Sequence, residues 1–369
     1  MENLSRRTFL EKIGVGTLST STIVSSLPTL ANLTFLENKR LNFALCGLGR
    51  YAEYLAEGLQ ETKFCKLAGI ITGTPEKALK WKKQYNIPEK NIYNYQNLDE
   101  IINNKDIDLV YIVLPNAMHK EYVIRAAKAG KHVIVEKPMA VSAKDCEEMI
   151  VACKKANVQL AVGYRLHYEP YNMELKRLGQ EKVFGQVRLV EASLGYNTGD
   201  SIDWHVKKTL SGGGPLMNLG VYCVQAARYI LGEEPKSVTA QYGTITNKTK
   251  YAEVEESITF QLNFPSGAVS THSTTYNCGI DRVYATAENG SFELSPAISY
   301  GPFVGKSSKG VMDFPQINQQ ATQCDEISKV ILAGKLLPEH IRGEEGLKDL
   351  KVLEAIYKAA DTGNKVLIK

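Results

Sequence analysis

A lysine placed directly after a buried strand is the first group in this sequence that could do chemistry. Residues 132–135 form an apolar run typical of a strand buried on both faces, and Glu136-Lys137-Pro138 ends that run. Open parallel sheets bind ligands at the carboxyl ends of their strands, so a Lys137 ammonium at that edge could hold a substrate or cofactor. Pro138 disfavours helical geometry at Lys137 and is typical of a fixed turn. The alternative is an ordinary strand exit with a solvated lysine.

A glycine-rich turn follows an apolar strand predicted for residues 41–46. Residues 47–52 read Gly-Leu-Gly-Arg-Tyr-Ala, the G-x-G-x-x-A spacing of a dinucleotide site. The first glycine permits the tight turn and the second lets a pyrophosphate approach the backbone, while the N-terminus of the following helix attracts the phosphates. The motif is weak alone, but a strand before it and a second strand at 65–71 support it. We expect cofactor contacts from Gly47, Leu48, Gly49, Arg50 and Tyr51.

The end of the second strand bears on which dinucleotide is bound. NAD enzymes usually place an acidic residue there for the ribose 2′-hydroxyl, whereas this sequence has Thr72 and, one turn into the next helix, Lys77. A hydroxyl and a cation suit a 2′-phosphate. The sequence therefore favours NADP over NAD. If Thr72 only caps the next helix, the choice stays open.

The elements that must position these residues alternate along the first half of the chain. Strands are expected near 41–46, 65–71, 109–114, 132–136 and 159–162, and helices near 50–60, 75–84, 119–129 and 142–156. This alternation predicts an α/β fold with a parallel sheet, a Rossmann dinucleotide-binding domain over residues 33–163.

A second domain is expected over residues 164–369. Period-two runs at 187–192, 257–262 and 268–271 predict a large, mainly antiparallel sheet with one open face, accompanied by helices near 171–178, 317–333 and 345–361. We expect an α+β domain for substrate binding and oligomerisation, and its C-terminal helices could pack back on the Rossmann domain.

The first 32 residues are expected to be a removable export signal. Residues 5–12 read Ser-Arg-Arg-Thr-Phe-Leu-Glu-Lys, a twin-arginine signature, and a mild apolar stretch leads to a small-residue cleavage site at Thr29-Leu30-Ala31. Residues 13–27 are too polar to span a bilayer stably. The sequence therefore predicts a periplasmic protein that uses the twin-arginine export machinery and has no stable membrane insertion.

Composition excludes several other classes of protein. A net charge of +4 and 23% charged residues, without a cluster of basic and aromatic residues, argue against nucleic acid as a partner. The seven cysteines are odd in number and contain no C-x-x-C pair, so neither a metal site nor a disulfide framework is expected. Most are expected to be core thiols.

Several motifs together resemble a known family, the Gfo/Idh/MocA oxidoreductases. The likeness runs from about residue 40 to the C-terminus and is carried by residues 47–52, 115–119, 129–132, 136–139, 163–165 and 343–346. Within the family, residues 163–168 and the Gly212-Gly213-Gly214 run are most similar to the glucose-fructose oxidoreductase branch. The resemblance implies a Rossmann domain, a substrate domain whose sheet forms oligomer interfaces, sugar substrates, and a homodimer or homotetramer.

The resemblance also implies catalytic roles for Lys137, Asn218 and Tyr222. Lys137 would anchor the substrate, and the proton donor would lie on the helix after the glycine run, where positions 218 and 222 share one face. Removing a hydride from a hydroxyl-bearing carbon requires a base for the O–H proton, and a nearby ammonium stabilises the phenolate of Tyr222. Asn218 departs from the aspartate of the family, and an amide cannot exchange protons.

Further cofactor-binding residues are implied with less specific motifs. They are Tyr95, Asn116, His119, Glu136, Lys137, Arg165, Trp204 and His205. For His119, hydrogen bonding at a helix start is an equal alternative. His205 replaces an arginine of the family pattern.

These residues predict an NADP-dependent sugar oxidoreductase. An aldose C1 hydroxyl would be oxidised to a lactone, and a second carbonyl sugar would then be reduced, with the dinucleotide doing the hydride chemistry. One alternative is an exported glycosidase that uses its dinucleotide for transient oxidation and elimination. The other is a non-catalytic sugar-binding relative, for which Asn218 is the only support.

Overall fold

A computed structural model describes residues 39–369, so the predicted export signal lies outside the described residues. In this part of the chain six parallel strands form one sheet in the order β3-β2-β1-β4-β5-β6. Its strands are β1 (Leu41–Cys46), β2 (Cys65–Ile71), β3 (Ile92–Tyr93), β4 (Leu109–Ile112), β5 (His132–Val135) and β6 (Leu160–Val162). The order reverses between β1 and β4, which makes the carboxyl ends of these two strands the switch point of the sheet.

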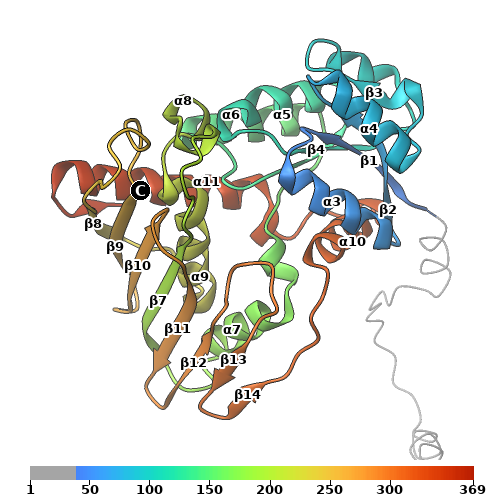
Figure 1. The fold of residues 1–369 in the computed structure, drawn as a ribbon. Coiled ribbons are helices and arrows are strands. Elements are labelled where there is room, and N and C mark those ends of the chain that lie inside the picture. The colour runs from blue at the N-terminus through green and yellow to red at the C-terminus, as the bar shows by residue number, and fades with distance from the viewer. Residues whose placement is uncertain (1–38) are drawn as a thin grey trace, which may run out of the picture.

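Helices cover both faces of this sheet. The helices between its strands are α3 (Arg50–Glu61), α4 (Pro75–Tyr85), α5 (His119–Lys128) and α6 (Ala143–Lys155). Figure 1 shows α5 and α6 on one side of β1 and β4, with α3 and the later helix α10 (Gln319–Leu332) on the other. Because both faces are covered, β4 is buried along its whole length, as its apolar sequence Leu-Val-Tyr-Ile requires. The predicted Rossmann fold is confirmed.

A second, larger sheet has nine strands among the described residues, in the order β14-β13-β12-β11-β7-β10-β9-β8-β15. They are β7 (Val187–Gly195), β8 (Ser237–Tyr242), β9 (Ser257–Asn263), β10 (Val269–Thr275), β11 (Ile280–Ala287), β12 (Gly290–Leu294), β13 (Gly305–Ser307), β14 (Gly310–Met312) and β15 (Val366–Leu367). Every pairing is antiparallel except β7 with β10. The predicted mainly antiparallel sheet is therefore confirmed.

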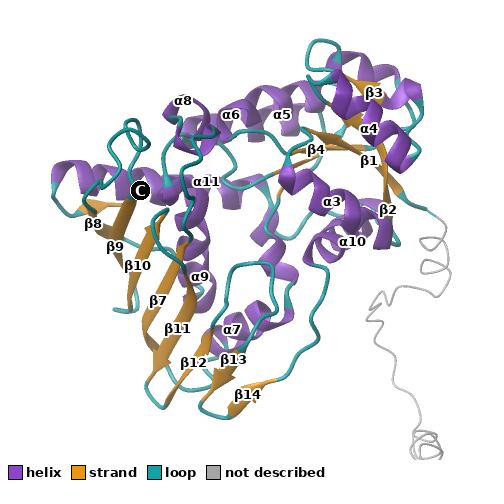
Figure 2. Ribbon diagram, in the orientation of Figure 1, coloured by secondary structure: helices purple, strands orange, loops and turns teal. Residues whose placement is uncertain are grey.

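One face of the large sheet carries helices and the other is open. Helices α7 (Pro170–Gln180), α9 (Val221–Leu231) and α11 (Gly343–Thr362) lie on the covered face, as Figure 2 shows. Alternate residues of β9 follow this division, since Ile258, Phe260 and Leu262 are buried and Thr259 is exposed. The open face is hollowed between β7, β8, β9 and β10.

The two domains share their last helices. Helix α10 packs against α3 and β2, and α11 packs against α6 and β6 at the Rossmann domain as well as against β8 of the large sheet. No helix in residues 39–369 is long and apolar enough to span a bilayer.

Candidate active site

The glycine turn has the geometry that a dinucleotide phosphate needs. Gly47 has φ +97°, and a Cβ there would lie 2.3 Å from the carbonyl oxygen of Val113, so only glycine fits. At Gly49 a Cβ would meet nothing within 4 Å, which leaves open space beside the first turn of α3. No side chain caps this helix, so its first N–H groups remain available to an anion. These residues fit the pyrophosphate of a dinucleotide.

The end of β2 places a hydroxyl and a cation beside this turn. The Thr72 hydroxyl accepts a hydrogen bond from the Thr74 N–H at 3.2 Å and keeps its own proton to donate. Lys77 Nζ donates to the Leu48 carbonyl at 3.0 Å, so its charge lies at the glycine turn. The Tyr95 ring packs against Gly73, since a Cβ at that position would lie 2.8 Å from the ring. Burial raises the pKa of Tyr95 to about 12, so this phenol stays neutral.

Lys137 lies between the two other predicted catalytic residues. It follows β5, and its peptide bond with Pro138 is cis. Lys137 Nζ donates to the Asn218 carbonyl at 2.8 Å and to Asn218 Oδ1 at 3.4 Å. The same ammonium lies 4.4 Å from the centroid of the Tyr222 ring, over its face. The structure thus brings Lys137, Asn218 and Tyr222 together at the carboxyl edge of the sheet.

Arg165 provides a second cation beside Tyr222. Its guanidinium carbon lies 5.4 Å from the Tyr222 ring centroid and 4.7 Å from that of Tyr300. The buried side chain donates to the carbonyls of Ile298 and Ser299 and to Gln319. Burial lowers the pKa of Arg165, but the phenols around it, Tyr222 first, raise it above its ordinary value. The sequence predicts Arg165 as a cofactor-binding residue, but no pattern in it indicates the contact with Tyr222.

Asn218 is held in one orientation by its neighbours. It lies in a π-helical turn, Leu216–Gly220, that leads directly into α9. Its Oδ1 faces Lys137, and its Nδ2 donates to the Tyr196 hydroxyl at 3.3 Å. The centroids of the Tyr196 ring and the buried Tyr276 ring lie 5.7 Å apart. The two tyrosines were missed, although Tyr196 directly follows β7, a strand-end position of the kind that identified Lys137.

The glycine run before this turn is clamped by a buried carboxylate. Glu255 accepts hydrogen bonds from the N–H groups of Gly214 and Leu216, both at 3.0 Å, and from the Tyr357 hydroxyl at 3.0 Å. A Cβ on Gly214 would lie 2.3 Å from the Glu255 carbonyl. Only a residue without a side chain at Gly214 lets the backbone come close enough to Glu255 for these hydrogen bonds. No sequence motif marks Glu255.

Glu136 points into the protein, under the site. Its carboxyl accepts a hydrogen bond from the Tyr111 hydroxyl at 2.6 Å, and a Cβ on Gly163 would lie 2.5 Å from Glu136 Oε1. Burial raises the pKa of Glu136 to about 7, although Tyr111, Lys137 and Arg165 oppose the shift. Burial thus favours the protonated form of this carboxyl over a wider pH range than in a free glutamate.

Asn116 and His119 tie the surrounding loops together. Asn116 Nδ2 donates to the Ser211 carbonyl at 2.8 Å. The fully buried His119 ring lies with Nε2 2.8 Å from the Leu114 carbonyl and Nδ1 3.1 Å from that of Pro138. Burial lowers the pKa of His119. Both its nitrogens contact backbone carbonyls, so this residue fixes the segment that follows Lys137.

Trp204 and His205 form a stacked pair beside the site. Their ring centroids lie 3.9 Å apart, and His205 Nδ1 lies 2.9 Å from Asp203 Oδ1. Burial lowers the pKa of His205 against the effect of Asp203, and the charge on Lys137 adds to the lowering. Burial and the Lys137 charge thus both favour the neutral form of the His205 ring.

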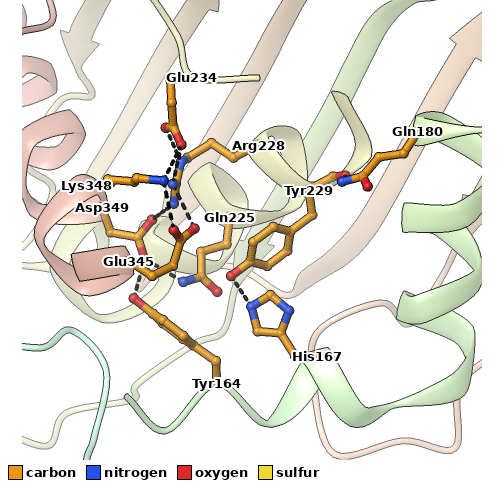
Figure 3. Close-up of polar contacts among 10 residues, drawn as sticks. All are labelled: Tyr164, His167, Gln180, Gln225, Arg228, Tyr229, Glu234, Glu345, Lys348 and Asp349. Carbon is orange, nitrogen blue, oxygen red and sulfur yellow. Dashed lines mark hydrogen bonds and ion pairs between the residues drawn. The ribbon is translucent and has the colours of Figure 1, made fainter. Parts of the chain in front are cut away.

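The helix that carries Tyr222 is anchored by a buried ionic network, drawn in Figure 3. Arg228 of α9 pairs with Asp349 at 2.5 Å and with Glu345 at 2.7 Å, both on α11, and with Glu234 at 2.7 Å. Gln225 of α9 also donates to Asp349. Burial raises the pKa of Asp349 to about 6 despite Arg228. The network fixes α9 against α11, and thereby fixes Tyr222.

Comparisons with known proteins agree with this architecture. Residues 41–164 match the family described as "Oxidoreductase family, NAD-binding Rossmann fold", and residues 172–293 match the GFO/IDH/MocA C-terminal domain. The crystal structure of the aldose-aldose oxidoreductase from Caulobacter crescentus, complexed with glycerol, is 41% identical, with a TM-score of 0.86 over 89% of this chain and 100% of that one.

Two further relatives are more distant. The D-xylose 1-dehydrogenase [NADP(+)] of Haloarcula marismortui is 26% identical over 340 residues, which are 88% of this chain and 92% of that protein. GenD2 from gentamicin A biosynthesis, solved in complex with NAD, shares the fold with a TM-score of 0.77 at 21% identity, over 90% of this chain and 97% of that one.

Proposed function

Because this chain belongs to the Gfo/Idh/MocA family of oxidoreductases, we propose that it is an exported, NADP-dependent sugar oxidoreductase. It oxidises the C1 hydroxyl of an aldose to a lactone and then reduces the carbonyl of a second sugar. When bound, the nicotinamide accepts the hydride in the first half-reaction and donates it in the second. The Caulobacter crescentus protein described above is named as an oxidoreductase of two aldoses, which supports a reaction between two sugars.

The observation that carries the proposal is the position of the Lys137 ammonium. It contacts Asn218 and covers the Tyr222 ring at the edge of the sheet, and the glycine turn lies at the same edge. A base for a sugar must lie within hydrogen-bond reach of the hydroxyl on the carbon that loses the hydride, because it takes the proton of that hydroxyl. Tyr222 is the titratable group that this geometry offers beside a fixed cation.

The protein's part in the reaction is to move one proton and to orient the sugar. Tyr222, with the Lys137 ammonium over its ring and the Arg165 guanidinium near it, acts as the base, and its deprotonated oxygen accepts the proton of the C1 hydroxyl. In the second half-reaction the phenol returns that proton to the carbonyl oxygen of the acceptor sugar. Asn218 keeps its amide fixed between Lys137 and Tyr196, so it can position a hydroxyl without changing the charge of the site.

Two observations support NADP as the dinucleotide. The end of β2 offers the Thr72 hydroxyl and the Lys77 ammonium in place of a carboxylate. The named xylose dehydrogenase relative uses NADP.

The test begins with the mature protein purified from the periplasm. Nucleotide released by denaturation is identified by mass spectrometry, and the native protein is mixed with individual aldoses while absorbance at 340 nm is followed. We expect bound NADP to become reduced and a second sugar to reoxidise it. Failure of every aldose to reduce the nucleotide would refute the proposal. Release of free sugar from a glycoside without net redox change would identify the glycosidase alternative.

A further inference from the structure

A segment of the second domain crosses to the glycine turn of the first. This segment, residues 295–303, links β12 to β13 and is called the strap here. At its tip the Tyr300 ring stacks on Tyr51 of α3, with centroids 6.4 Å apart, and lies 5.1 Å from the ring of Tyr54. Tyr51 is the second residue of the helix whose N-terminus faces the open space at Gly49. The strap therefore brings an aromatic side chain to the edge of the phosphate site.

The base of the strap is held from both sides. The Asp281 carboxylate accepts hydrogen bonds from three consecutive backbone N–H groups, those of residues 297–299, at 2.8 to 2.9 Å. On the opposite side, Arg165 binds the carbonyls of Ile298 and Ser299. Ile298 is buried, whereas Tyr300 is 54% exposed. The base of the strap is thus held by side chains from two other segments, whereas Tyr300 remains about half exposed, an arrangement that core packing alone does not require.

We propose that the strap is a second-domain part of the dinucleotide site, and that Tyr300 retains the bound nucleotide between the two half-reactions. The proposal rests on the proposed function, because a nucleotide that serves two sugars in turn must stay bound. Contacts from both domains slow release more than contacts from one, since both sets must break before the ligand leaves. Arg165 links the strap to Tyr222, so retention and proton transfer share one support.

The test measures nucleotide release directly. The holoprotein, loaded with NADPH, is diluted into excess NADP, and the loss of bound-nucleotide fluorescence gives the dissociation rate. The nucleotide-to-protein ratio after gel filtration is a second readout. We expect Tyr300→Ala to release nucleotide at least tenfold faster and to leave purification with a lower ratio. Tyr300→Phe keeps the ring and should release at the wild-type rate.

Two further variants separate retention from folding. Asp281→Asn weakens the base of the strap without removing a ring, and we expect it also to accelerate release. Tyr284→Ala removes a ring of equal size from β11, whose contact is with Arg282, and should leave release unchanged. Wild-type release rates in both Tyr300→Ala and Asp281→Asn would overturn the proposal.

The sugar chemistry is scored separately in the wild-type protein. If release depends on Tyr300 but no aldose reduces the bound nucleotide, the strap assignment stands and the proposed reaction falls. If aldoses reduce the nucleotide but release ignores the strap, the reaction stands and the retention role falls.

Discussion

At the scale of single residues, two cations converge on one phenol. The Lys137 ammonium lies over the Tyr222 ring, and the Arg165 guanidinium lies near the same ring. The acid next to Lys137 in sequence, Glu136, accepts hydrogen bonds from the Tyr111 hydroxyl and the Lys137 backbone N–H, while the Lys137 ammonium donates to Asn218. The positive charge therefore remains available to a phenolate and to a developing alkoxide.

Tyr222→Phe should lower the rate at which an aldose reduces bound nucleotide by roughly 10²- to 10⁴-fold, the usual contribution of a general base. Nucleotide content after purification should not change, because the Tyr222 hydroxyl is proposed to transfer the proton of the sugar and not to bind the nucleotide phosphates. Stopped-flow absorbance measures the rate. Tyr229→Phe is the matched control, because Tyr229 also lies on α9 but its hydroxyl contacts His167, and this variant should react like wild type. Retained activity in Tyr222→Phe would remove Tyr222 from the mechanism.

Thr72→Asp should shift cofactor preference toward NAD. A carboxylate at this position repels a 2′-phosphate and accepts a hydrogen bond from a 2′-hydroxyl, and the shift should be roughly 10- to 100-fold. Titration of nucleotide-free protein with NAD and NADP gives both dissociation constants. An unchanged ratio would mean that the 2′-phosphate lies elsewhere.

Much of the candidate site could be located from the sequence at this scale because the signals of its residues are local. Lys137 ends an apolar run, and the glycine turn has a fixed spacing, so each needs only its own neighbours in sequence. Arg165 at Tyr222, Tyr196 at Asn218 and Glu255 at the glycine run depend on contacts between distant segments, for which one sequence has no pattern.

At the scale of elements, α9 determines where Tyr222 points. Its register is set by the buried pairs of Arg228 with Asp349 and Glu345, and by the π-helical turn before it. The side chain of Arg228 is 2% exposed, so its charge is satisfied by protein groups and not by water. A buried charge left alone is costly, and this makes α9 sensitive to the loss of one partner.

Arg228→Met should lower the free energy of unfolding by about 3–5 kcal/mol, because it leaves Asp349 and Glu345 buried without their cation. Urea denaturation followed by circular dichroism measures the change. Arg177→Met is the matched control, since Arg177 also pairs with two glutamates but on the exposed surface of α7, and it should cost at most about 1 kcal/mol. Equal losses would show that the buried network contributes no more than a surface pair.

Sequence patterns predicted the long elements of the Rossmann domain to within a few residues but missed much of the second sheet. Strands β8, β11 and β12 were not predicted, because their polar and apolar residues alternate only partly and their partners are distant in sequence. The π-helical turn was expected as ordinary helix, since its extra residue leaves the apolar pattern of 216–221 unchanged.

At the scale of the whole molecule, buried carboxyls link stability to pH. Glu136 has its pKa raised to about 7 from an ordinary 4.5. Both states hold the proton below pH 4.5, and only the folded state holds it between 4.5 and 7, so unfolding becomes easier as the pH rises through this window. Asp349, raised to about 6 from 3.8, acts in the same direction at lower pH.

Glu136→Gln should remove part of this loss of stability at higher pH. The amide oxygen can still accept a hydrogen bond from the Tyr111 hydroxyl, but the amide has no proton to lose. Between pH 4 and pH 8 the free energy of unfolding of the variant should therefore rise by on the order of 3 kcal/mol relative to that of wild type. Urea denaturation at several pH values measures the difference. Parallel curves for the two proteins would show that Glu136 titrates normally.

The predicted export signal can also be tested on the whole chain. The expected signal at residues 5–12 is read by a receptor as a sequence and not as a charge, so replacing Arg6 and Arg7 by lysines should keep the protein in the cytoplasm. Cell fractionation and immunoblotting locate the protein, with the unchanged chain as the reference. Normal export of the double lysine variant would exclude the twin-arginine route.

Helix α11 runs for 20 residues, about 30 Å, and its contacts extend from α6 and β6 in one domain to β8 in the other. A helix that packs on both domains restricts their relative motion, because separating the domains would bend the helix or break its contacts with one of them. We therefore expect sugars to enter and leave through an entrance that is permanently open. Turnover should not depend on opening and closure of the two domains.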